Sequence, residues 1–284
     1  MSPLFFFFLL AQVGAAPAIG TSPLETPPEI REQRRVAQPT APVTAVAAPV
    51  GSAGCIAEIE ADPVRGVEAA QQAMWRAAGE ERVRAGLCLG MALVDLERFD
   101  EAQRAFADAR EAAADEDRAS RARLGAMAGN AALAGGRPGA AMGALDAALA
   151  DAKAVSDKAL AAEVELDRAR ALVALDRPAE AGSALADARL LAPGDAQAWL
   201  LSATLARREN RLDEAQQQIE EAARIDPANP EVGLEAGVIA MLGGREEAAR
   251  RSWRSVMATA PGSPAAATAQ GYINQLAPQP ETGR

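Results

Sequence analysis

The chain has 284 residues, a net charge of −10 and no histidine. An acidic chain without a stripe of basic residues is not typical of proteins that bind nucleic acid. The absence of histidine removes the commonest metal ligand and the commonest general base. The sequence also lacks Gly-rich phosphate-binding loops, nucleophile-elbow motifs and pairs of residues at the spacing of zinc ligands. We therefore expect no enzymatic activity, no cofactor and no metal site. All cations except Lys153 and Lys158 are arginine, which suits a bacterial genome of high GC content.

Residues 1–18 are typical of a secretory signal peptide. The apolar run 3–13 is too short to span a bilayer and is followed by small residues from Ala15 to Ala18. No Lys or Arg precedes this run, so the terminal amine is the only positive charge before it. We expect a periplasmic or secreted protein. The alternative is an uncleaved segment that anchors the chain in the inner membrane.

A flexible linker is expected over 19–54, because this segment is rich in proline and alanine and has no apolar periodicity. Order should resume at Cys55, in a solenoid domain that covers 55–277. A short helix, a turn at Asp62-Pro63 and a longer helix then form an irregular N-terminal hairpin. Such a hairpin would cover the exposed end of a repeat array.

Two helix–turn–helix patterns follow, over 83–116 and 122–155. Each has a small residue in the first helix and a large apolar residue in the second, and neither ends in proline. Extra residues at 117–121 and 156–161 add about one helical turn to each unit. Because 111–120 is compatible with helix, we expect the second helix of the first unit to be unusually long.

The next three units, 162–195, 196–229 and 230–263, repeat with a strict period of 34 residues. In the middle unit two helical faces flank a turn at Asn210-Arg211, and Asp226-Pro227 ends the second helix. Shifting this register by one period in either direction again finds small residues, a large apolar residue and a proline at the same places. A helix over 264–276 should cap the array, and 278–284 is expected to be a flexible tail.

These spacings resemble the tetratricopeptide repeat (TPR), which has small residues at positions 8 and 20, a large apolar residue at 24, Ala at 27 and Pro at 32. With Ala196 as position 1, these slots hold Ala203, Ala215, Ile219, Ala222 and Pro227. The chain is thus similar to exported bacterial TPR proteins. The resemblance implies an all-α fold, a right-handed α-solenoid of antiparallel helix pairs. It would contain about five repeats, the irregular N-terminal hairpin and the C-terminal capping helix.

The resemblance also implies that the first helices line a concave groove, mostly through positions 2, 5, 9, 12 and 13. We expect the groove arginines to hold carboxylates of an acidic partner segment, and the leucines to supply apolar contact. The alternative is that these arginines are ordinary surface charges. Chaperone-binding TPR domains have a Lys–Asn clamp where this chain has Leu87 and Met91, so that clamp is absent. The candidate groove residues are Arg123, Asn130, Leu166, Arg170, Leu200, Thr204, Arg207, Arg208 and Leu234.

The function implied by the resemblance is that of a non-catalytic scaffold or adaptor in the cell envelope that binds a protein or peptide. Neither nucleic acid nor a small-molecule substrate is expected. The alternative is a structural or self-associating module whose groove holds its own linker or a second copy. The sequence leaves the partner and the oligomeric state open.

The two cysteines, Cys55 and Cys88, are expected to form a disulfide, because an even number of cysteines in an exported chain is typical of pairing. The bond would join the N-terminal hairpin to the first full repeat. Closing this loop would stabilise the fold by about 4 kcal/mol in the chain-entropy model. The alternative is two buried free thiols.

Overall fold

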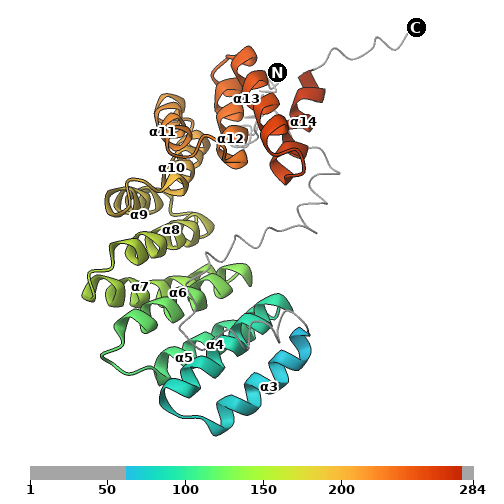
Figure 1. Ribbon diagram of the computed structural model, residues 1–284. Coiled ribbons are helices and arrows are strands. Elements are labelled where there is room, and N and C mark those ends of the chain that lie inside the picture. The colour runs from blue at the N-terminus through green and yellow to red at the C-terminus, as the bar shows by residue number, and fades with distance from the viewer. Residues whose placement is uncertain (1–61, 277–284) are drawn as a thin grey trace, which may run out of the picture.

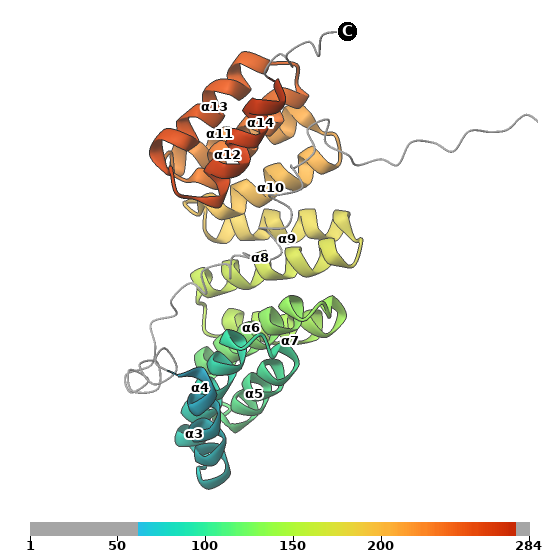
Figure 2. The same cartoon turned by 90° about the vertical axis from the view of Figure 1, so that its right-hand side faces the viewer.

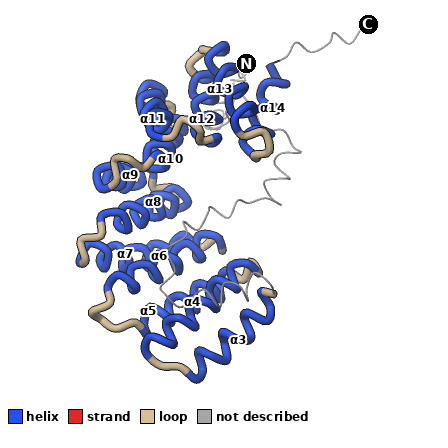
Figure 3. Tube along the Cα trace, viewed as in Figure 1, coloured by secondary structure: helices blue, strands red, loops and turns tan. Residues whose placement is uncertain are grey.

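The computed structural model describes residues 62–276. Every regular element within this range is a helix (Figure 3). The predictions for the signal peptide, the linker, Cys55 and the C-terminal tail lie outside the described residues. None of the described helices is long and apolar enough to cross a membrane.

The described helices follow one another through short turns (Figure 1). Their bounds are α3 Pro63–Arg76, α4 Gly79–Asp95, α5 Phe99–Ala112, α6 Arg118–Ala134, α7 Pro138–Ala154, α8 Lys158–Ala174, α9 Pro178–Leu191, α10 Ala196–Arg208, α11 Leu212–Ile225, α12 Pro230–Leu242, α13 Glu246–Thr259 and α14 Pro264–Leu276.

Consecutive helices from α4 to α13 pack in pairs as five hairpins, α4–α5, α6–α7, α8–α9, α10–α11 and α12–α13. Helix α3 precedes the first hairpin and α14 follows the last. Each hairpin packs on the next, so the chain forms a continuous stack, which is also seen after a 90° turn (Figure 2). The prediction of an all-α repeat solenoid is confirmed.

The first helices of the hairpins lie on the inner side of an open arc (Figure 1). Helix α6 contacts α8, α10 contacts α12, and α12 contacts α14, although a second helix separates each of these pairs in the chain. Contact between alternate helices requires them to lie on the shorter, inner side of the curve. We call this inner side of α4, α6, α8, α10 and α12 the concave face.

The extra residues of the early units lengthen the first helices α6 and α8, and also the second helix α7, which has 17 residues where α5 and α9 have 14. Helices α6 and α8 have 17 residues, whereas α10 and α12 have 13. The prediction of a long second helix in the first unit is wrong, because α5 ends at Ala112 and has the same 14 residues as α9. The residues that follow Ala112 explain why α5 ends there. Ala113 is buried in an extended conformation, and the Asp117 side chain accepts a hydrogen bond from the Ser120 amide to start α6.

All five hairpin turns contain one residue in the left-handed backbone region, at the same place in each repeat. These residues are Glu97, Gly136, Asp176, Asn210 and Gly244, with φ between 56° and 71°. Glycine and asparagine adopt this conformation at little cost, whereas a residue such as glutamate is strained there. The turns therefore share one geometry although their sequences differ.

Close helix crossings explain why a small residue is needed at position 8. In three hairpins this residue is glycine, and a Cβ atom added to it would collide with the large apolar side chain at position 24. The pairs are Gly90 with Phe106, Gly129 with Leu145, and Gly237 with Trp253. The glycines therefore let a bulky side chain of the second helix lie directly on the backbone of the first.

Alanine substitution should have opposite effects at two helical glycines. Gly237→Ala is expected to lower the free energy of unfolding by about 1–3 kcal/mol, because the new methyl group meets the fully buried Trp253 ring. Gly143→Ala is the matched control. No atom lies within 4 Å of its added Cβ, so removing backbone entropy should raise stability by about 0.5–1 kcal/mol. Urea titration measures both changes, and a stabilised Gly237→Ala variant would contradict this packing.

Helix α14 covers the end of the last hairpin. Tyr272 is buried, and its ring centroid lies 5.1 Å from that of Trp253. The opposite side of α14 exposes Gln270 and Asn274, whose side chains are hydrogen-bonded to each other. A buried aromatic side and a polar outer side suit a helix that ends a repeat array.

Candidate functional site

The concave face carries most of the predicted groove residues, but the three predicted leucines are part of the core. Leu166, Leu200 and Leu234 are between 5% and 7% exposed and pack in the interior of the hairpins. The expectation that these leucines supply open apolar contact therefore needs correction. Position 5 faces inward in these repeats because it lies over the neighbouring helix.

Three of the four predicted groove arginines are paired with carboxylates of the chain itself. Arg207 Nε donates to Glu235 Oε1 at 2.6 Å, which links α10 to α12. The remaining two pairs are the contact between Arg123 and Asp157, with 3.8 Å between nitrogen and oxygen, and the hydrogen-bonded pair of Arg170 with Asp167. Arg208 is exposed and makes no ion pair with the rest of the described chain. The middle of the concave face is therefore less basic than its arginine content suggested.

Asp167 is the buried centre of one of these networks. Its carboxylate accepts hydrogen bonds from Asn130 Nδ2 at 2.7 Å and from Arg170. Burial raises the pKa of Asp167, and the neighbouring Arg170 and Asn130 oppose that rise. Asn130 thus joins α6 to α8, so this predicted groove residue is engaged in packing between repeats. Thr204 is engaged within its own helix, where its hydroxyl donates to the Leu200 carbonyl at 3.0 Å.

Glu163 differs from the other charged groups on this part of the concave face. It lies at the surface of α8, and its side chain makes no hydrogen bond or ion pair within residues 62–276. Partial burial raises its pKa, and so do the nearby carboxylates of Asp167, Asp157 and Asp195, while Arg123 lowers it. Position 2 of the repeat predicts that Glu163 lines the groove, but the charged candidates chosen from the sequence are arginines and include no acidic residue.

An apolar area lies on the same face towards the N-terminal end of the solenoid. Leu87, Met91 and Val94 of α4 and Met127 of α6 are partly buried and pack against the core below them. They leave part of each side chain at the surface. The concave face therefore changes from apolar at α4 to acidic at α8.

A second charge cluster joins α5, α6 and α7. The Asp151 side chain is 4% exposed and receives Arg110 at 2.6 Å and Arg118 at 2.8 Å, with Arg121 at 3.8 Å. Arg121 also donates to the backbone carbonyls of Arg110 and Ala113 at 3.4 Å. This cluster fastens the loop at which the strict repeat spacing is interrupted.

Metal-binding geometry is not found in the described range, where no three Cys, Asp or Glu side chains are grouped so as to hold an ion. The carboxylates of Asp157 and Asp195 contribute to the raised pKa of Glu163, but these three residues do not form such a set. The chemistry that the face offers is therefore that of charged and apolar contacts.

Cys88 lies in α4 and is buried, with 8% of its surface exposed. Its predicted partner, Cys55, lies outside the described residues, so the disulfide remains a prediction. In protein purified from an oxidising compartment and denatured without reductant, thiol titration should find no free thiol. The titration should find two free thiols after reduction, and two before reduction would contradict the pairing.

Comparisons with known proteins agree with this geometry. A family model described as tetratricopeptide repeat matches residues 196–229, which form α10, α11 and the turns around them. No curated protein matches the chain significantly.

Several solved structures have a similar fold. PilW, described as a widely conserved type IV pilus biogenesis factor, is 17% identical with a TM-score of 0.60, over 76% of this chain and 94% of its own. BtubC from P. vanneervenii is 15% identical with a TM-score of 0.56, and the match covers 81% of this chain and 95% of BtubC. A thermophilic TPR protein from Thermus thermophilus is 19% identical with a TM-score of 0.53, and the match covers 68% of this chain and 98% of that protein's chain. At these identities the similarity concerns the fold alone.

Proposed function

We propose that this chain, in which residues 196–229 match the tetratricopeptide repeat, is a non-catalytic scaffold of the cell envelope that binds a protein or peptide on its concave face. TPR folds are typical of modules for protein–protein interaction. The observation that carries the proposal is the arrangement of the first helices, which present one continuous inner surface over five hairpins (Figure 1). Such a surface suits an elongated segment better than a compact small molecule.

The side chains on this surface support recognition of a polypeptide. Partly exposed apolar side chains at α4 and charged side chains at α8 and α10 occur on the same face. A peptide can satisfy both kinds of contact because its side chains alternate along an extended backbone. The envelope location is supported by the apolar run and small residues of the first 18 residues.

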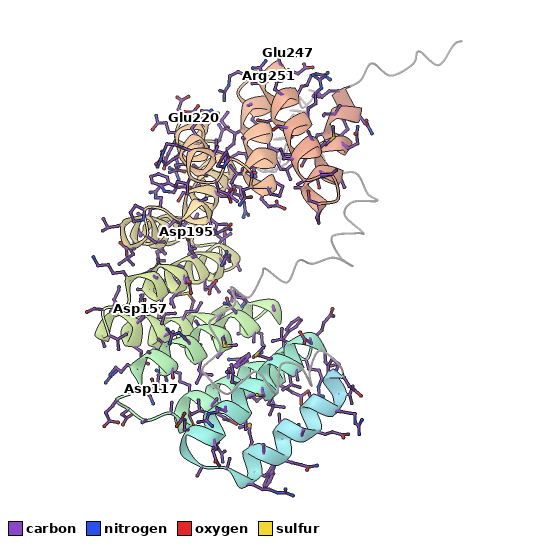
Figure 4. All side chains as sticks on the ribbon, viewed as in Figure 1. Asp117, Asp157, Asp195, Glu220, Glu247 and Arg251 are labelled. Atoms are coloured by element: carbon purple, nitrogen blue, oxygen red, sulfur yellow. The ribbon has the colours of Figure 1, made fainter. Side chains whose placement is uncertain are left out.

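Photo-cross-linking in living cells tests the binding face. A photoreactive amino acid is placed at Met91 or Thr204 on the concave face, and at Glu220 or Arg251 on the outer helices α11 and α13 as matched controls (Figure 4). We expect discrete cross-linked products from the two concave positions and none from the outer pair. Products from the outer positions alone would contradict the proposal.

The location has a separate test. Osmotic shock should release the mature chain with the periplasmic proteins, or the chain should appear in the culture medium. Retention of the protein inside spheroplasts as a soluble species would contradict the envelope part of the proposal and leave the binding part standing.

A further inference from the structure

The hairpins are held to one another by different contacts along the solenoid. Between α4–α5 and α6–α7, Arg137 pairs with Asp100 at 2.7 Å. Between α6–α7 and α8–α9, Asn130 donates to Asp167 at 2.7 Å. Hydrogen bonds and ion pairs are strong only within a narrow range of geometry, so contacts of this kind hold two hairpins at one angle.

The interface between α10–α11 and α12–α13 is held in the same way. Arg207 donates to Glu235 and Arg245 donates to Gln216, each at 2.6 Å. The first pair joins the first helices α10 and α12, and the second joins the turn before α13 to α11. Because the two contacts involve different parts of the hairpins, together they resist rotation of one hairpin on the next.

The interface between α8–α9 and α10–α11, which we call the middle interface, is held differently. Within residues 62–276, no side-chain hydrogen bond or ion pair joins α8 or α9 to α10 or α11. Arg189 of α9 instead lies over the Trp199 ring of α10, 4.8 Å from its centroid. A Cβ added to Gly182 of α9 would still lie 3.9 Å from Leu205 of α10. Apolar contacts are not directional, so these two surfaces can slide on each other.

The repeat register shows why the middle interface lacks a polar link. The acceptors Asp167 on α8 and Glu235 on α12 hold the same repeat position, and Leu201 holds that position on α10. The position of the donor Arg207 is held on α8 by Val173. Val173 and Leu201 are partly buried and pack against the same core cluster. The middle interface therefore has apolar side chains where the next interface has a charged pair.

We propose that α3–α9 and α10–α14 are two bodies that rotate about a hinge at the middle interface, and that this motion widens and narrows the concave face. The contact between α9 and α10 is less extensive than that between α5 and α6 or between α7 and α8. The helices stay intact, because the motion needs only small sliding of packed side chains. The middle interface lies near the centre of the arc, so a small rotation there changes the distance between the two ends (Figure 1). This motion belongs to the free chain and does not depend on the proposed function.

Pulsed electron paramagnetic resonance on the full chain tests the hinge. Spin labels are attached through a genetically encoded ketone amino acid, so the native cysteines are not used. One label pair, Gly143 on α7 and Gln217 on α11, spans the middle interface. The control pair, Arg104 on α5 and Ser183 on α9, spans two other interfaces, and all four residues are exposed at the same repeat position. We expect the distance distribution of the first pair to be about twice as wide as that of the control pair.

A charged pair introduced at the middle interface should suppress the motion. Val173→Arg combined with Leu201→Glu moves the Arg207–Glu235 pair back by one repeat. In this double variant the label pair that spans the middle interface should have the same width as the control pair. Val173→Ala combined with Leu201→Ala is the matched control, because it removes the same side chains without adding charge, and its distribution should stay wide. Circular dichroism checks that both variants remain helical.

Two results would overturn the hinge. The first is equal width for the two label pairs in the native chain, a comparison that needs no substitution in the interface and holds even where the double variant does not fold. The second is a distribution that stays wide in a folded double variant, since the motion would then lie elsewhere. Neither result decides whether the concave face binds a partner, which the photo-cross-linking experiment tests separately.

Discussion

Asp151→Asn is expected to lower the free energy of unfolding by about 3–5 kcal/mol, because it leaves clustered arginines around a group that no longer carries charge. The native carboxylate is 4% exposed and accepts from Arg110 and Arg118 at 2.6 and 2.8 Å. Asparagine keeps the volume, so the loss reports charge and hydrogen bonding rather than a cavity. Urea titration followed by circular dichroism measures the change.

Asp146→Asn provides the control on the same helix. Asp146 pairs with Arg168 at 2.9 Å, but its side chain is 57% exposed, so the expected loss is at most about 1 kcal/mol. Equal losses in the two variants would show that burial of Asp151 does not determine its contribution.

Trp253→Ala is expected to have a similarly large effect, again about 3–5 kcal/mol. Trp253 is fully buried, its Nε1 donates to the Leu234 carbonyl at 3.2 Å, and its ring packs against Tyr272 and the backbone of Gly237. Truncation would open a cavity between the last hairpin and α14. The lower stability should appear as a lower midpoint in thermal and urea unfolding.

Trp75→Ala is the matched control, because Trp75 is 89% exposed on α3. Surface substitutions of this kind change stability by about 0.5 kcal/mol or less. A midpoint for Trp253→Ala close to that of Trp75→Ala would contradict the placement of α14 as a packed cap.

The sequence predicted the hairpins well because their signal is local. A period of 34 residues with small and large side chains at fixed places reports how two neighbouring helices cross, and Ala215 and Trp253 are both fully buried as that register requires. The length of α5 could not be read in the same way. A helix-permissive stretch after Ala112 is interrupted by the cap at Asp117, which competes with continuation of the helix.

The site was harder to predict because pairing between charges depends on contacts distant in sequence. Arg207 and Glu235 are 28 residues apart, and Asn130 and Asp167 are 37 apart. In a chain with 29 basic and 39 acidic residues, nothing in the pattern distinguishes a paired arginine from a free one. For the same reason Asp151 resembles a solvated surface acid until α5, α6 and α7 are brought together.

The stacking of hairpins against their immediate neighbours makes the chain a row of coupled units. Opening of an end unit such as α14 breaks its contacts with one hairpin, whereas opening of a central hairpin breaks contacts with two neighbouring hairpins. Amide hydrogen exchange should therefore be slowest around α8 and α9 and faster towards α13 and α14. A partner that spans several first helices would tie these units together, so its binding would slow exchange in hairpins that it does not touch.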